Sequence, residues 1–411
     1  MKPVRADYLA KKWVKYPSIT DVKHAGRVVE IEPRSVLLFA GVKTVLVTHK
    51  EIRNWDQMSA VLIPGDVVSI NKAGVCTLLA PWRSQRLKDY DEQEARVIIK
   101  KMRLQQNWNQ FISGIGEFFA KHKFLPVQTS TLVDNPGPEP TIDVFKTQFK
   151  EGKESRGKYL ITSPELSLKK LVSQTLTPLF EITKVYRNNE NSAKHAPEFW
   201  MLEWYRPFAN LSTVAQDVED LILFLRQYLS LKMKAPAFQH TSFQKILKEH
   251  YAFLFTPDSS ASDLKKCLTQ NQVYFSESLS LDDLFSLVNL ELVEPQLGAQ
   301  DVVFLNRYPP YAAALAKLDQ DGWAERFEVY WKGLEIGNAF HELNDPDIQL
   351  QRLIEDNKKK LENGLEALPL DMEFIESLNR GLPPTAGISI GLERLFMALY
   401  DEPDIKNLKW I

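Results

Sequence analysis

Two patterns of apolar residues divide this chain, and together they limit the folds that it can adopt. Short runs rich in Val, Ile and Leu, separated by Gly and Pro, occupy residues 27–81. Such runs predict β-strands. Apolar residues at spacings of three and four follow over 95–122, which predicts a long amphipathic helix. We therefore expect a small all-β barrel or curled sheet over residues 1–90 and a larger α+β domain over residues 95–411.

The same reading assigns individual elements in both parts. The strands expected in the small module are 27–32, 35–41, 43–49, 61–63, 66–70 and 74–81. In the larger domain we expect helices at 212–235 and 347–363, paired strands within 322–345, and a strand at 387–391 that leads into a final helix from Leu392. Residues 82–95 are charged, hold no turn cluster and are interpreted as the connection between the two domains.

Charge is unevenly distributed. The net charge of −2 combines a balance of +7 over residues 1–90 with −9 over the rest. A basic module on an acidic body suggests a negatively charged partner, either nucleic acid or an acidic protein; a solvated basic surface is the alternative. No run of apolar residues suits a membrane span or a secretory signal. The two cysteines, Cys76 and Cys267, are far apart in the sequence and indicate no disulfide framework. We therefore expect a cytoplasmic protein without a membrane partner.

Several common catalytic signatures are missing from the sequence. There is no Gly-rich phosphate loop, no G-x-S-x-G elbow and no His or Cys cluster of zinc-site spacing. If the chain is an enzyme, its chemistry must depend on carboxylates, arginines and bound metal ions.

The segment YRNNENSAKHAPEFWMLEWYRP, residues 186–207, has the pattern of a β-hairpin. The two-residue period of a strand places Glu203 and Tyr205 on one face. A carboxylate beside a phenol can bind an ammonium group through charge-assisted hydrogen bonds. A structural Arg–Glu pair in a half-buried strand is the alternative.

The segment RFEVYWKGLEIGNAFHELND, residues 326–345, places Glu328 and Glu335 on either side of a Lys-Gly turn. In a hairpin the two carboxylates could approach each other, and they would repel unless a cation lay between them. Oxygen ligands beside a nucleotide favour magnesium. Alternating surface carboxylates, including Glu342, would give the same pattern.

In GISIGLERLFMAL, residues 387–399, two glycines flank a short strand that runs directly into a helix. Arg394 lies in the first turn, where the helix dipole disfavours a cation. This position suits an arginine that binds an anion or stacks on a flat ring. A salt bridge to a neighbouring carboxylate is the alternative.

In this order, the three segments resemble the catalytic core of the class II aminoacyl-tRNA synthetases. The phrases ITSPELSLKKL (161–171), EFWMLEWYRP and EIGNAFHELND are similar to the lysine branch, and most similar to the elongation factor P lysine ligases within it. The resemblance covers about residues 95–411. It implies an antiparallel sheet flanked by helices, and a homodimer. The basic N-terminal module looks like a trimmed barrel of the OB type, in which Trp13, Tyr16, Phe39 and Trp55 are available for RNA.

The resemblance also implies a role for individual residues. The arginines that act on the ATP α-phosphate and against the nucleotide match the expected catalytic residues Arg187 and Arg394. The remaining ATP-binding positions would be Asn188, Asn189, Ala196, Glu335, Ile336 and Gly391. The amino-acid substrate would be bound by Ser163, Pro164, Glu165, Glu203, Tyr205, Glu342 and Ser389. Magnesium would be held by Glu328 and Glu335.

The implied reaction uses ATP and magnesium to convert lysine or β-lysine into an aminoacyl adenylate. The acyl group then passes to a lysine of elongation factor P or, in a synthetase, to tRNA. The chain departs from the family pattern at six positions: Ser130, Asn189, Ala193, Ala196, Ala339 and Ser389. These changes leave a third possibility, a catalytically weakened binding module that keeps the fold.

Overall fold

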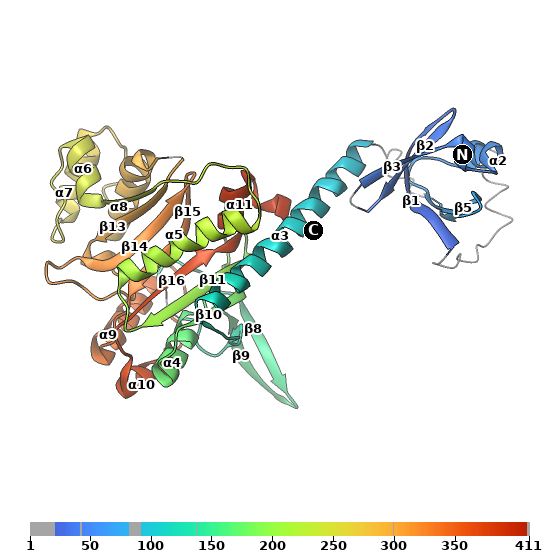
Figure 1. The fold of residues 1–411 in the computed structure, drawn as a ribbon. Coiled ribbons are helices and arrows are strands. Elements are labelled where there is room, and N and C mark those ends of the chain that lie inside the picture. Colours follow the sequence, from blue (N-terminus) through green and yellow to red (C-terminus); the bar gives the residue numbers. More distant parts are fainter. Residues whose placement is uncertain (1–20, 42, 82–91, 138, 299, 409–411) are drawn as a thin grey trace. The chain divides into compact units, whose positions relative to one another are not determined.

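The computed structural model describes residues 21–41, 43–81, 92–137, 139–298 and 300–408 (Figure 1). Of the expected connection at 82–95, residues 82–91 lie outside the described residues, as do Trp13 and Tyr16. Its last four residues are not a connection, because they begin the helix α3 (Glu92–Lys121). The chain forms two compact units. One runs up to Asn109 and includes the residues from Asn407 onward, and the other is Gln110–Lys406.

The N-terminal unit contains a five-stranded antiparallel sheet in the order β3-β2-β1-β4-β5. Its elements are β1 (Val22–Glu32), β2 (Ser35–Ala40), β3 (Lys43–Thr48), α2 (Trp55–Val61), β4 (Val67–Asn71) and β5 (Cys76–Ala80). The central strand β1 pairs with both β2 and β4, and α2 connects β3 to β4. This arrangement confirms the OB-like sheet.

The strand predicted at 61–63 is wrong, because Val61 ends the helix α2. Trp55, Met58 and Val61 recur every three residues and are all buried in the core of the small unit. That spacing suits a helix that covers a sheet rather than a strand. It also removes Trp55 from the side chains available for base stacking, because only 9% of its surface is exposed.

The second unit is built on an eight-stranded sheet in the order β12-β13-β14-β15-β16-β11-β10-β6. Neighbouring strands from β13 to β10 are antiparallel, and the outermost pairs, β12 with β13 and β10 with β6, are parallel. The strands are β6 (Leu125–Pro126), β10 (Leu179–Tyr186), β11 (Glu198–Pro207), β12 (Phe238–Ser242), β13 (Val302–Tyr308), β14 (Ala324–Trp331), β15 (Leu334–His341) and β16 (Thr385–Gly391). The expected hairpins at 186–207 and 322–345 are therefore confirmed.

A small separate sheet contains β7 (Leu132–Val133), β8 (Lys146–Glu151) and β9 (Glu154–Leu160). The helices are α3 (Glu92–Lys121), α4 (Glu165–Thr175), α5 (Leu211–Tyr228), α6 (Phe243–Tyr251), α7 (Ala261–Gln270), α8 (Leu281–Val288), α9 (Pro346–Glu362), α10 (Met372–Gly381) and α11 (Leu392–Tyr400). The helix expected at 212–235 ends seven residues early, at Tyr228, where the chain turns through Ser230 with a positive φ of 51°. In the described part of the chain, no helix is both long and apolar enough to cross a membrane.

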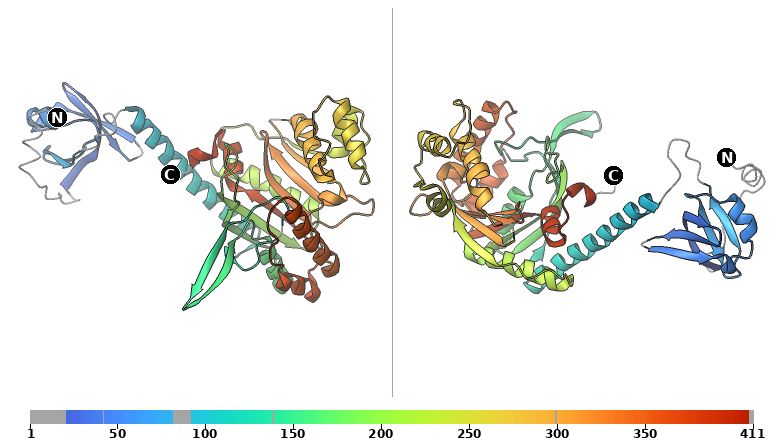
Figure 2. Two further views of the ribbon diagram at one scale, coloured as in Figure 1. Left: turned by 180° about the vertical axis from the view of Figure 1, so that it is seen from behind. Right: turned by 90° about the horizontal axis from the view of Figure 1, so that it is seen from above.

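Helices cover both faces of the large sheet (Figures 1 and 2). On one face α5 lies along β14, β15 and β16. Trp204 of β11 points to this face, where its indole lies 5.2 Å from the ring of Phe119 and its Nε1 donates to Asp217 of α5 at 3.2 Å. The alternation of the strand therefore sends Glu203 and Tyr205 to the opposite face, which α4 and α10 border.

Candidate active site

A cavity of about 220 Å³ opens on the face of the sheet opposite α5. Its walls come from the segment after β10, from β11, β15 and β16, and from the start of α11. The expected site residues that line it are Ser163, Glu165, Arg187, Ala196, Glu335, Ile336, Ser389, Gly391 and Arg394. Segments that are more than 200 residues apart in the sequence thus meet at one cavity.

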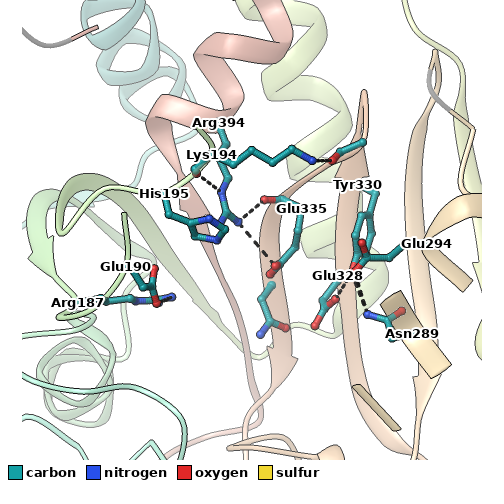
Figure 3. A network of polar contacts seen from close by, with 12 residues as sticks. Arg187, Glu190, Lys194, His195, Asn289, Glu294, Glu328, Tyr330, Glu335 and Arg394 are labelled. Carbon is teal, nitrogen blue, oxygen red and sulfur yellow. Dashed lines mark hydrogen bonds and ion pairs between the residues drawn. The ribbon is translucent and has the colours of Figure 1, made fainter. Parts of the chain in front are cut away.

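Two arginines give this cavity a positive region (Figure 3). Arg187 lies over the ring of Phe199 at 5.3 Å, and its buried Nε has no hydrogen-bond partner within the described residues. Arg394 donates from Nη1 to the main-chain oxygen of Glu335 at 2.8 Å, which fixes its direction. An unsatisfied guanidinium N–H in a cavity wall fits an anionic ligand, because a buried donor without a partner is destabilising.

The two expected metal ligands share the hairpin of β14 and β15. Lys332 and Gly333 form its turn with positive φ angles of 53° and 70°, which suits a tight two-residue connection. Burial and the nearby Glu328 carboxylate raise the pKa of Glu335 to about 7. A cation between the two carboxylates would relieve this repulsion.

The immediate surroundings of these two glutamates differ. Glu328 accepts hydrogen bonds from Arg326 at 2.6 Å and from Tyr330 at 2.7 Å, so both its oxygens have donors. Glu335 lies 3.7 Å from Arg394 as an ion pair. Within the described residues no group of three or more His, Cys, Asp or Glu could hold a metal. Two carboxylates alone would hold magnesium only with waters and phosphate oxygens as its other ligands.

The motif after β10 differs from the expected arrangement. Asn188 and Asn189 both donate to the same oxygen of Asp143, at 2.8 and 3.0 Å, and neither lines the cavity. Glu190 lines it instead, 4.0 Å from Arg187. Glu190 was not among the expected ATP-binding residues, although a glutamate one place after the family position was a visible signal.

The expected amino-acid pocket lies beneath the cavity floor. Glu203 and Tyr205 are 1% and 2% exposed. The Tyr205 hydroxyl donates to one oxygen of Glu203 at 2.7 Å, and the Ser163 hydroxyl donates to the other at 3.0 Å. Burial and the Glu165 carboxylate raise the pKa of Glu203 well above its ordinary value. The geometry suits a carboxylate that exchanges a proton for a bound cation.

Strand register brings the pocket together. Glu203 on β11 is opposite Ser389 on β16, Ser389 is opposite Asn338 on β15, and Asn338 is opposite Glu328 on β14. Directly paired residues share a face. One row of polar side chains therefore crosses four strands, from the expected amino-acid pocket to the expected metal ligands.

Two features of the pocket were not predicted from the sequence. The first is Gly387, where a Cβ atom would lie 2.4 Å from the Tyr205 ring, so a glycine is required for that ring to fit. The second is Lys169 on α4, which is fully buried and contacts Glu165 and Glu342 at 2.5 Å each. The i,i+4 spacing of Glu165 and Lys169 on a helix was the available signal. Two of the carboxylates expected in the amino-acid pocket, Glu165 and Glu342, therefore already form ion pairs with Lys169.

The remaining expected residues are close to the site but not in its wall. Pro164 is the N-cap residue of α4 and places Glu165 in the first turn. Glu342 is 1% exposed and directly follows β15. His195, which was not predicted, lines the cavity, and burial together with Arg394 lowers its pKa.

The antiparallel sheet, with Arg187 after one hairpin strand and Arg394 at the start of α11, indicates the catalytic domain of a class II aminoacyl-tRNA synthetase. The chain belongs to this family, because the model of the family described as tRNA synthetases class II (D, K and N) matches residues 85–410.

Among known proteins, the chain is similar to several named elongation factor P–(R)-β-lysine ligase. The identity is 33% to that of Haemophilus influenzae strain PittGG over 303 residues, which are 73% of this chain and 91% of the relative. It is 32% to that of Haemophilus ducreyi over 304 residues, 73% and 90% of the two chains. It is 34% to that of Salmonella paratyphi B over 289 residues, 69% and 86%.

Proposed function

We propose that this chain is an ATP-dependent ligase that activates lysine or β-lysine as an aminoacyl adenylate and transfers it to a lysine side chain of elongation factor P. The observation that carries the proposal is the juxtaposition of Arg187 and Arg394 with a buried carboxylate pocket beneath the same cavity. The arginines suit the phosphates, and the carboxylates suit a substrate with two ammonium groups. The named relatives support the choice of acceptor.

The chemistry follows from this placement. The carboxylate oxygen of the amino acid attacks the α-phosphorus of ATP, and pyrophosphate leaves. Arg187 stabilises the charge that develops on the α-phosphoryl oxygens. Magnesium held by Glu335 and Glu328 would neutralise phosphate charge. The acceptor amine then attacks the acyl carbonyl and AMP leaves, so no protein nucleophile is required. Positioning supplies most of the catalysis.

A label-transfer reaction tests the proposal. The protein is incubated with ATP, magnesium, radiolabelled lysine or β-lysine, elongation factor P and total tRNA, and the products are separated on a gel. Label on elongation factor P is the expected result. Label on RNA would assign the chain to tRNA aminoacylation. Absence of label on both would favour the third possibility, a catalytically weakened binding module. The hydrogen bonds from Asn188 and Asn189 to Asp143 support that possibility, because neither asparagine lines the cavity.

The OB-like sheet favours tRNA aminoacylation as the second candidate, because basic OB folds bind nucleic acid. The proposal further includes a cytoplasmic location and assembly as a homodimer. Light scattering on the purified protein tests the dimer, and a mass near 47 kDa would exclude it.

A further inference from the structure

Lys169 is the most completely buried cation near the pocket, with no exposed surface. It lies one turn after Glu165 on α4, and its Nζ is 2.5 Å from Glu165 Oε1 and 2.5 Å from Glu342 Oε2. The ring of Phe374 on α10 lies 6.0 Å from the same nitrogen. A buried ammonium with two carboxylate partners at this distance has a fixed position.

This arrangement distributes the charges of the pocket unequally. Among the described residues, the three carboxylates of Glu165, Glu203 and Glu342 have one buried cation beside them, Lys169. Lys169 contacts two of them, whereas Glu203 receives hydrogen bonds only from two neutral hydroxyls, and no ion pair reaches it among the described residues. A carboxylate that is 1% exposed and lacks a charged partner is costly unless it is protonated or binds a cation.

We propose that Lys169 is a positioning residue for the amino-acid substrate: its ammonium holds Glu165 and Glu342 as ion pairs and leaves Glu203 as the carboxylate that takes the side-chain cation of the substrate. This inference rests on the proposed function, since it names how the same pocket selects a diamino acid. Lys169 acts through its two partners and does not touch the reacting atoms.

The role of Lys169 has a measurable signature in the pH dependence of lysine binding. The titratable and charged groups that face it are Glu165 on its own helix, Glu342 after β15, and Glu203 and Tyr205 on β11. Burial and the Glu165 carboxylate raise the pKa of Glu203 well above its ordinary value, so we expect the empty pocket to keep a proton that a bound cation displaces. Lysine binding should then strengthen as the pH rises and level off. Removing Lys169 removes a charge that favours proton loss. The pH at which binding levels off must therefore rise.

The experiment measures lysine-dependent ATP–pyrophosphate exchange from pH 6 to 9.5 for the full-length wild type, Lys169→Met and Lys169→Arg. We expect Lys169→Met to move the midpoint of the lysine KM profile up by at least about one pH unit, and to raise KM at pH 7 at least about tenfold. The change in kcat should be smaller than the change in KM. Lys169→Arg keeps the charge and should restore the wild-type midpoint.

Lys170→Met is the matched control. Lys170 is the next residue on α4, and it pairs with Asp371 at 2.8 Å outside the pocket. Its removal should leave the midpoint unchanged. The double variant Lys169→Met/Glu342→Gln removes one charge of each sign, so it supplies a folded comparison if Lys169→Met does not fold. Its midpoint should still lie above that of the wild type, because Glu203 and Glu165 remain without the internal cation.

An unchanged midpoint in Lys169→Met and in Lys169→Met/Glu342→Gln, with only a lower melting temperature, would show that Lys169 is merely structural. That result would overturn the inference. If the wild type exchanges no pyrophosphate with any amino acid, the proposed function fails instead. Calorimetric titration of lysine into the same variants over the same pH range then decides the role of Lys169 without catalysis. A shifted midpoint supports the inference, and a common midpoint or no binding by the wild type overturns it.

Discussion

Replacement of Glu203 by Gln tests the substrate pocket most directly. The change keeps the size of the side chain and removes its charge. Because Glu203 is 1% exposed, a substrate ammonium that binds it is shielded from water. Losing one partner of such a buried charge pair costs about 2–4 kcal/mol. We therefore expect kcat/KM for lysine to fall roughly 30- to 700-fold.

Norleucine, which lacks the distal ammonium of lysine, provides the internal comparison in an ATP–pyrophosphate exchange assay. The wild type should prefer lysine over norleucine by a factor similar to the expected fall in kcat/KM for lysine. Glu203→Gln should accept lysine and norleucine nearly equally. Glu198→Gln is the control, because Glu198 lies on the same strand with a side chain that is 43% exposed. A lysine-to-norleucine ratio that is unchanged in Glu203→Gln would refute this account of the pocket.

Four further results are expected. In the wild type, KM for lysine should fall as the pH rises, by up to about tenfold per pH unit, and then level off. Burial and the Glu165 carboxylate raise the pKa of Glu203 well above its ordinary value, so Glu203 must lose a proton to bind the substrate cation, and affinity rises with pH. Arg187→Ala should lower kcat for adenylate formation about 10²- to 10³-fold while calorimetry finds lysine binding little changed, if the guanidinium binds the phosphates as proposed. Glu335→Gln should shift the magnesium titration of activity to higher concentration, since one of the two carboxylates proposed to hold the ion loses its charge. An unchanged titration would exclude Glu335 as a ligand. Trp204→Ala should lower the free energy of unfolding by about 3–5 kcal/mol in chemical denaturation, because the indole is completely buried against Phe119.

Local patterns in the sequence were sufficient for much of the fold. The two-residue period of 201–205 assigned Glu203 and Tyr205 to one face and Trp204 to the other, and the structure confirms this. The Lys-Gly turn placed Glu328 and Glu335 on one hairpin. These features depend on neighbours along the chain, and backbone geometry alone determines them.

Local patterns failed where a tertiary contact decided the outcome. The run at 61–63 is apolar enough for a strand, but it belongs to the end of a helix that covers the sheet of the small unit. Asn188 and Asn189 follow the hairpin strand as expected, yet both donate to Asp143, which is distant in the sequence, and neither lines the cavity.

Short segments of the sequence encode the hairpins, the glycines and the arginine in the first turn of the last helix, so the residue types of the site could be predicted from the sequence. The sharing of charge among them depends on tertiary packing. The register of four strands aligns Glu203 with Ser389, Asn338 and Glu328. The packing of α4 inserts Lys169 between Glu165 and Glu342. Both depend on pairings between distant segments, and the energy of a buried charge depends on partners that no local pattern specifies.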